Sequence, residues 1–100
     1  MGYRVKESIE TGGESNVKRD GWSFSTYGQA TYHIRQRMKE IIKKDTLGFF
    51  RYTGQKVTAE KLDSVCREEL VSWLDESDGR QFCYVAGYLG WSCFWDIEEI

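Results

Sequence analysis

The segment over residues 82–97, FCYVAGYLGWSCFWDI, is rich in large apolar side chains. Gly87 and Gly90 bracket Tyr88 and Leu89 within it. Since glycine adopts positive φ at no steric cost, this spacing predicts a β-hairpin closed by a loop of about four residues. The segment is too short and too polar to cross a bilayer. We therefore predict a buried strand pair against which the rest of the chain folds.

Side chains alternate between the two faces of a strand, so the predicted hairpin divides its side chains into two sets. The set expected on one face is Cys83, Val85, Trp91, Cys93, Trp95 and Ile97. The other face takes Phe82, Tyr84 and Phe94. Large side chains thus occur on both faces, and we expect both to be covered, one of them by a foreign partner or a second copy of the chain.

The composition is typical of a folded protein with one core. The chain has 100 residues, of which 40% are hydrophobic and 15% aromatic, enough to form a core without metals or disulfides. We expect a single globular domain over residues 1–100. The three cysteines form no C-x-x-C pair, and no apolar leader precedes Arg4 and Lys6. These features predict free thiols, a cytoplasmic location and no membrane segment.

The net charge of −2 conceals a polarity along the chain. Residues 1–56 carry eleven Lys/Arg against six Asp/Glu, a balance of +5, whereas residues 57–100 carry three against ten, a balance of −7. Such asymmetry is consistent with two charged faces, one of them for a partner. The alternative is that the two halves interleave in space and neutralise each other.

The first quarter of the chain has the pattern of extended structure. Tyr3, Val5 and Ile9 alternate with polar residues, which predicts a strand over residues 3–10. Residues 11–16 have the composition of a loop, and residues 17–26 resume the extended pattern. An Asp-Gly turn signal at residues 20–21 leaves open whether this second segment forms one strand or two.

A first helix is predicted from the capping box formed by Thr26 and Gln29. Its apolar stripe is Ala30, Ile34, Met38, Ile41 and Ile42, and a basic row of Arg35, Lys39 and Lys43 follows another face. We expect it to end near residues 44–45, where lysines suit the negative end of the helix dipole.

Three further elements complete the expected fold. Residues 47–53, LGFFRYT, have the aromatic composition of a central strand closed by Gly54. Thr58 is placed to cap a second, acidic helix that stops at residues 78–79. The order ββαβαββ predicts an α+β fold, with an antiparallel or mixed sheet of four to five strands and two amphipathic helices on one face.

No residue pattern indicates catalysis. Use of His33 would require a nucleophile or second ligand within hydrogen-bond reach, and the sequence indicates none, so we expect an exposed helix histidine. The cysteines lack zinc spacing, and the glycines form no phosphate-binding loop. We therefore predict a protein without enzymatic activity, cofactor or metal site.

The function predicted first is binding to another protein, as small inhibitors and phage-type or stress-type regulators do. Tyrosine, tryptophan and arginine are the usual anchors of protein interfaces. The residues expected to bind the partner are Arg35, Lys39, Lys43, Tyr88, Trp91 and Trp95. A monomer or a weak homodimer is compatible with this prediction.

The alternative function is binding of single-stranded nucleic acid, with phosphates along the basic helix and bases stacked on the aromatic strand. The residues that would take part are Arg35, Lys39, Lys43, Phe49, Arg51 and Tyr52.

Overall fold

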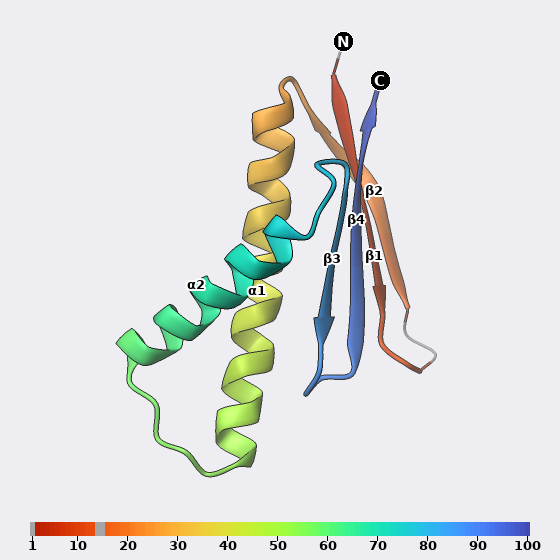
Figure 1. Ribbon diagram of the computed structural model, residues 1–100. Coiled ribbons are helices and arrows are strands. Elements are labelled where there is room, and N and C mark those ends of the chain that lie inside the picture. Colours follow the sequence, from red (N-terminus) through yellow and green to blue (C-terminus); the bar gives the residue numbers. More distant parts are fainter. Residues whose placement is uncertain (1, 14–15) are drawn as a thin grey trace.

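The computed structural model describes residues 2–13 and 16–100, so part of the predicted loop over residues 11–16 lies outside the described residues. Four strands form one antiparallel sheet in the order β2-β1-β4-β3. Their bounds are β1 Tyr3–Glu10, β2 Val17–Phe24, β3 Gln81–Ala86 and β4 Trp91–Glu99. The two chain ends lie side by side at one end of the sheet (Figure 1), where Gly2 and Ile100 exchange main-chain hydrogen bonds of 3.0 and 2.9 Å.

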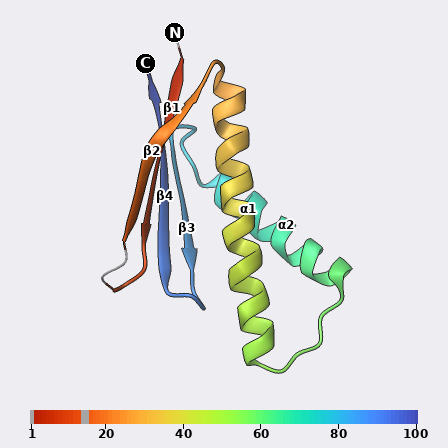
Figure 2. The same ribbon diagram turned by 180° about the vertical axis from the view of Figure 1, so that it is seen from behind.

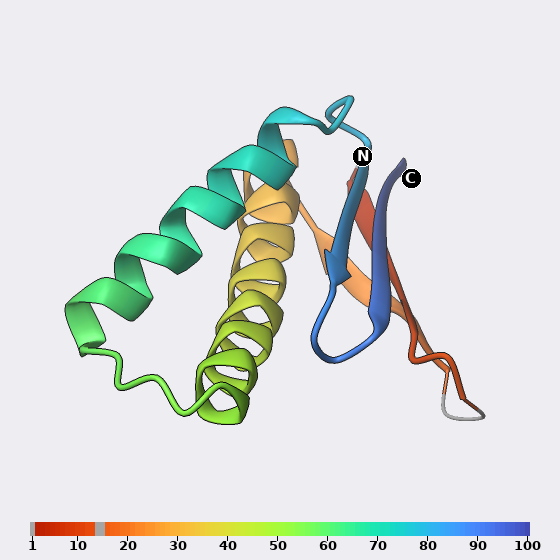
Figure 3. The same ribbon diagram turned by 60° about the horizontal axis from the view of Figure 1, so that its bottom comes forward.

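Two helices lie on the same side of this sheet, as Figures 2 and 3 show from other directions. Helix α1 spans Tyr27–Tyr52 and α2 spans Ala59–Asp75. α1 covers the sheet and contacts β1, β2 and β3. α2 packs mainly on α1 and contacts the sheet at β3, where the Trp73 and Tyr84 rings meet edge to face at 5.5 Å. The predicted α+β fold, with its antiparallel sheet and two helices, is confirmed.

The core lies between α1 and the sheet. Its most completely buried large side chains are Val5, Ile34, Met38, Ile42, Cys93 and Trp95. The predicted apolar stripe of the first helix is confirmed, because Ala30, Ile34, Met38, Ile41 and Ile42 are all buried. α1 therefore uses one face, spaced at three and four residues, to cover the sheet.

The hairpin forms as predicted, but the side chains of β3 lie on the opposite faces of the sheet from those predicted. Strands β3 and β4 are joined by residues 87–90, with Gly90 at a φ of +71°. Directly opposed pairs share a face, and Tyr84 pairs with Cys93 while Cys83 pairs with Phe94. Tyr84 is consequently buried, and Cys83 lies on the face without helices. The prediction that Cys83 and Val85 share a face with Trp91 was therefore wrong. With four residues in the loop, odd-numbered positions of β3 pair with even-numbered positions of β4.

The predicted strand over residues 47–53 is also wrong, because residues 47–52 continue α1 and the order is ββααββ. Gly54 closes the helix rather than a strand. It has a φ of +70°, its N–H donates to the carbonyl of Arg51 at 3.2 Å, and the N–H of Gln55 donates to Phe50 at 3.0 Å. This pair of bonds is a Schellman motif, which satisfies the last carbonyls of a helix. α1 thus ends at Tyr52 and not near residues 44–45 as predicted.

The predicted N-terminal caps of both helices are confirmed. The side chain of Thr26 accepts from the N–H of Gln29, whose own side chain accepts from the Thr26 N–H, forming the predicted capping box. Thr58 caps α2 by accepting from the N–H of Lys61 at 3.1 Å. The predicted stop at residues 78–79 was wrong, because α2 ends at Asp75. Asp78 instead accepts from the main-chain N–H groups of Arg80 and Gln81, where β3 begins.

The second extended segment forms one strand, β2. Opposite β1, the register advances from Val5↔Trp22 to Glu7↔Arg19, so Asp20 and Gly21 together oppose a single residue. This is a β-bulge, which bends the strand without ending it. The Asp-Gly signal therefore marks an irregularity within β2 and not a turn between two strands.

Candidate interaction surface

Three aromatic side chains are exposed together where α1 extends past the sheet. The exposed fractions are 47% for Phe49, 77% for Tyr52 and 45% for Tyr88. The rings of Tyr52 and Tyr88 lie 5.8 Å apart, and Phe49 and Tyr88 line the same cavity. We refer to Phe49, Tyr52 and Tyr88 as the helix-end surface.

The length of α1 explains why these rings are exposed. Phe49 and Tyr52 lie 15 and 18 residues after Ile34, which places them on the stripe that faces the sheet. Figure 1 shows that this end of α1 extends beyond the β3–β4 hairpin. The apolar stripe is thus longer than the sheet that it covers, and Tyr88 in the hairpin loop packs against its far end.

The hairpin loop is fixed to α1 through Asp45. Its carboxylate accepts from the N–H of Leu89 at 2.8 Å and from the hydroxyl of Tyr84 at 3.3 Å. Burial and the charge of Asp45 raise the pKa of Tyr84, so the phenol keeps its proton. A Cβ atom built on Gly48 would lie 2.8 Å from the Tyr88 ring, so glycine permits this close contact. These contacts fix the position of Tyr88 relative to α1.

Basic side chains lie close to the aromatic rings. The Lys44 ammonium lies 4.9 Å from the centre of the Trp91 ring, and that of Lys61 lies 5.9 Å from the Phe50 ring. Arg51 is exposed on the last turn of α1. Lys44 of α1 and Lys61 of α2 thus lie against two aromatic rings that are not part of the helix-end surface.

The residues predicted to bind a protein partner differ in how far the structure exposes them. Arg35, Lys39 and Lys43 are exposed along α1, and Tyr88 is exposed in the hairpin loop. Trp91 is half-buried on the helix side of the sheet. Trp95 is 1% exposed, so it cannot contact a partner, and its assignment to the binding surface was wrong. The side chain lies between the sheet and α1 because β4 is a central strand.

The aromatic segment predicted to bind nucleic acid is exposed, but it does not form the predicted strand. Phe49, Arg51 and Tyr52 are exposed, on a helix rather than on a strand. The stacking platform of a sheet predicted from these residues is therefore wrong. The structure instead brings Phe49 and Tyr52, predicted for nucleic acid, beside Tyr88, predicted for a protein partner.

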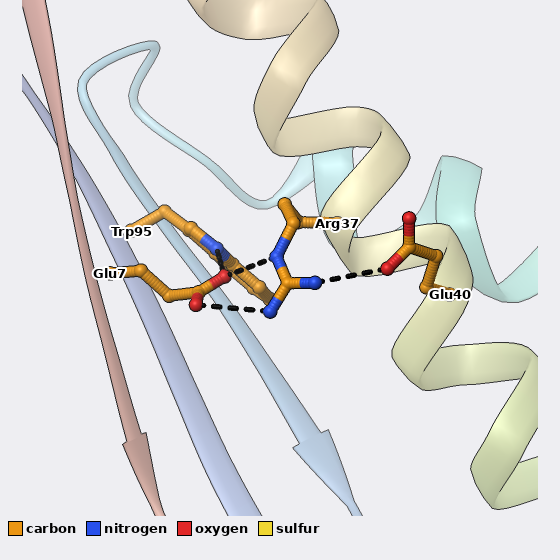
Figure 4. Close-up of polar contacts among 4 residues, drawn as sticks. All are labelled: Glu7, Arg37, Glu40 and Trp95. Atoms are coloured by element: carbon orange, nitrogen blue, oxygen red, sulfur yellow. Dashed lines mark hydrogen bonds and ion pairs between the residues drawn. The ribbon is translucent and has the colours of Figure 1, made fainter. Parts of the chain in front are cut away.

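A buried ionic network, which the sequence did not indicate, joins α1 to the sheet (Figure 4). The Glu7 carboxylate is fully buried and accepts from Arg37 through Nε at 2.8 Å and Nη2 at 3.1 Å, and from the Trp95 indole N–H at 2.8 Å. Arg37 also pairs with Glu40 at 2.9 Å. The only sequence signal was Glu7 itself, a charged residue within an alternating strand pattern.

The balance of charge in this network favours the ionised carboxylate. Burial alone would raise the pKa of Glu7, but hydrogen bonds from Arg37 and Trp95 and the Arg37 charge outweigh it and lower the pKa. The same interactions raise the pKa of Arg37. Both partners therefore stay charged, and the network has the character of a structural ion pair rather than of an acid–base catalyst.

His33 and the cysteines offer little chemistry. His33 is half-buried against the Trp22 and Phe24 rings at 4.3 and 5.2 Å, so the prediction of an exposed histidine was wrong. Burial lowers its pKa, and its Nε2 has no hydrogen-bond partner among the described residues. Burial also raises the pKa of the Cys66 thiol and that of Cys93, the latter to about 11, which disfavours the reactive thiolate.

Over residues 2–13 and 16–100, no group of three His, Cys, Asp or Glu side chains is placed to hold a metal ion. Within the same part of the chain, no helix has the length and apolar composition needed to cross a membrane. Comparison with known protein families, with curated proteins and with solved structures finds no match for this chain.

Proposed function

We propose that this chain is a small non-enzymatic protein that binds another protein through the helix-end surface, in the manner of an inhibitor or regulator of a larger partner. The observation that carries the proposal is the joint exposure of Phe49, Tyr52 and Tyr88, which come from elements far apart in the sequence. Exposed aromatic side chains that adjoin one another are typical of protein interfaces.

Preorganisation supports this proposal. The Asp45 carboxylate holds the hairpin loop, and the Schellman motif fixes the last turn of α1. A surface whose backbone is already ordered loses less conformational entropy on binding, which increases the affinity of a given set of contacts. Tyrosine and phenylalanine further supply large contact areas with few rotatable bonds.

Single-stranded nucleic acid is the second candidate ligand. It is favoured by the exposure of a basic row and of two aromatic rings on one helix: Arg35, Lys39, Lys43, Phe49, Arg51 and Tyr52. The Tyr52 and Tyr88 rings, however, are tilted by 50° against each other, so they form a cluster rather than separate stacking positions. Nucleic-acid binding predicts an affinity for mixed oligonucleotides that falls steeply with salt.

The test compares two exposed tyrosines of α1. Tyr52 belongs to the helix-end surface, and Tyr32, with 64% exposure, lies near the opposite end of the same helix. Wild-type protein, Tyr52→Ala and Tyr32→Ala each serve as bait in affinity capture from a lysate of the native host, with quantitative mass spectrometry. We expect Tyr52→Ala to weaken capture of the partner about thirtyfold, the effect of losing an interface hot spot, and Tyr32→Ala to leave it unchanged.

Two outcomes contradict the proposal. Equal capture by all three baits would mean that the partner binds elsewhere. A captured ligand that is a nucleic acid, released by salt, would favour the second candidate. The absence of enzymatic activity and the cytoplasmic location stay predictions.

A further inference from the structure

The outer edge of β3 carries main-chain groups that are free to pair with another strand. The carbonyls of Arg80 and Ala86 accept from Ile97 at 2.9 Å and from Gly90 at 2.8 Å, so even-numbered positions of β3 direct their main-chain groups toward β4. Successive residues of a strand alternate in this direction. The N–H and C=O groups of Cys83 and Val85 therefore point away from the sheet.

The two edges of the sheet differ in how they are protected. The other edge strand, β2, carries Lys18, Arg19 and Asp20 and is interrupted by a bulge. Charges and bulges discourage an edge from pairing with a foreign strand. β3 has the sequence QFCYVA, with no charged residue, and its register with β4 is continuous. Of the two edges, β3 is the one without these protections.

A cavity beside this edge can accept side chains from an added strand. It has a volume of about 420 Å³ and lies between α1, α2 and β3. Its apolar lining comes from Phe49, Phe50, Val65, Tyr84 and Tyr88, and its polar lining from Asp45, Thr46 and Glu69. Both carboxylates already accept hydrogen bonds within the protein, Asp45 from Tyr84 and Leu89 and Glu69 from Trp73. Because Tyr84 faces the helices, a side chain at the neighbouring position of an added strand would point into this cavity.

The opposite face of the edge is apolar in the middle and acidic at one end. Val85 is 52% exposed there, and Phe94 is exposed next to Cys83. A second cavity of about 530 Å³ at the start of β3 is lined in part by Glu76 and Asp96, neither of which forms an ion pair within the described residues. This end of the edge favours a positively charged side chain.

We propose that the β3 edge binds an extended segment of a partner protein as a fifth strand. Its main chain pairs with Cys83 and Val85, one large apolar side chain enters the cavity beside Tyr84, and a lysine or arginine lies near Glu76 and Asp96. This is strand addition, in which the main chain supplies affinity and pockets for alternate side chains supply specificity. The inference rests on the proposed function in taking a protein as the partner, and the cavity shares Phe49 and Tyr88 with the helix-end surface.

A second copy of this chain fits the edge less well than a single segment does. A two-fold interface uses the same surface on both partners. Since α2 contacts β3 through Trp73 and Tyr84, a second copy would bring its own α2 to the space beside the shared seam. A single extended segment carries no such helix.

The test uses a phage-displayed library of random peptides selected on the wild-type protein, followed by affinity measurements on the selected peptides. Val85→Pro removes one outward N–H and leaves the bonds to β4 intact, while Val85→Thr keeps that N–H and the branched side chain. We expect the selected peptides to alternate apolar residues and to carry lysine or arginine. Val85→Pro should weaken their binding by at least about tenfold, and Val85→Thr by little.

Amide hydrogen exchange on the wild-type protein keeps the test decisive if Val85→Pro folds poorly. We expect the amides of Cys83 and Val85 to exchange fast in the free protein and to be protected by bound peptide. Failure to select any peptide, or protection of other amides only, would overturn the inference. So would a dimer that Val85→Pro dissociates, since a second copy would then occupy the edge. Tyr32→Ala, near the other end of α1, should leave peptide binding intact. The result is separable from the test of the helix-end surface, because Val85 lies outside that surface and Val85→Pro changes none of its three residues.

Discussion

The Glu7 carboxylate lies between β1 and α1 with its side chain fully buried, so its charge has to be matched within the protein. Arg37 matches it with two hydrogen bonds, and Trp95 donates a third. Buried pairs of this kind add little net stability when complete, but removing one partner leaves an unmatched charge. This network fixes α1 against the sheet at one position.

We predict that Glu7→Gln lowers the free energy of unfolding by about 3 kcal/mol, because the Arg37 guanidinium loses its buried counter-charge. Glu40→Gln is the matched control, since Glu40 pairs with the same arginine at the exposed surface and should cost less than about 1 kcal/mol. Urea denaturation measures both. Equal losses for the two variants would show that burial of the Glu7 pair is unimportant.

The lowered pKa of Glu7 makes stability depend on acid. A carboxyl whose pKa is lower in the folded state stabilises the fold above its unfolded pKa, which is about 4.3 for glutamate, and the effect is lost as pH falls through the folded value. We predict that the stability advantage of the wild type over Glu7→Gln shrinks as pH is lowered below about 4. Denaturation curves across that range measure it, and a constant difference would contradict the prediction.

At the scale of elements, Gly48 couples α1 to the β3–β4 hairpin. Glycine within a helix costs about 1 kcal/mol relative to alanine, so its presence needs a reason. The ring of Tyr88 occupies the space that a Cβ atom would fill. Gly28 lies in the first turn of the same helix and has no such constraint. A Cβ atom built on it would have its nearest neighbour at 4.0 Å.

We predict that Gly28→Ala stabilises the protein by up to about 1 kcal/mol, whereas Gly48→Ala gains less than this or destabilises, because the Tyr88 ring must move. Thermal unfolding measures the stabilities. Gly48→Ala should also weaken binding of a partner at the helix-end surface, which Gly28→Ala should not. Equal stabilisation by both variants would mean that the Tyr88 contact contributes little.

For the whole molecule, the face of the sheet without helices decides the oligomeric state. Trp91 and Trp95 lie on the helix side, so of the β4 aromatic residues only Phe94 is on that face. Its direct neighbours across the strands are Ser8 and Cys83, and Lys6, Lys18 and Asp96 line the same hollow. Lys6 also pairs with Glu98 at 2.7 Å. We expected aromatic residues of β4 to need cover on both faces. On the face without helices, this applies to one side chain, Phe94.

We therefore predict a monomer at micromolar concentrations, since isolated exposed aromatic residues are common on monomeric proteins. Light scattering measures the mass in solution. A dimer that Phe94→Glu dissociates would show that the open face is a self-association surface after all.

The elements whose formation depends on local interactions followed from the sequence. The capping box at Thr26, the apolar stripe of α1, the cap at Thr58 and the glycine-bracketed hairpin each depend on residues within a few positions of one another. Their spacing therefore carried the information. Tyr88 is exposed in that hairpin loop, and its role in binding stays a prediction.

Whatever depended on contacts between distant segments was decided by the tertiary structure. Residues 47–53 favour a strand by composition, but residues 47–52 are helical, and Gly48 and Tyr52 contact Tyr88 of the distant hairpin loop. Trp95 is buried because β4 lies centrally, and strand order is not encoded in local periodicity. The Glu7–Arg37 pair joins residues 30 positions apart, so its energy exists only once α1 lies on the sheet.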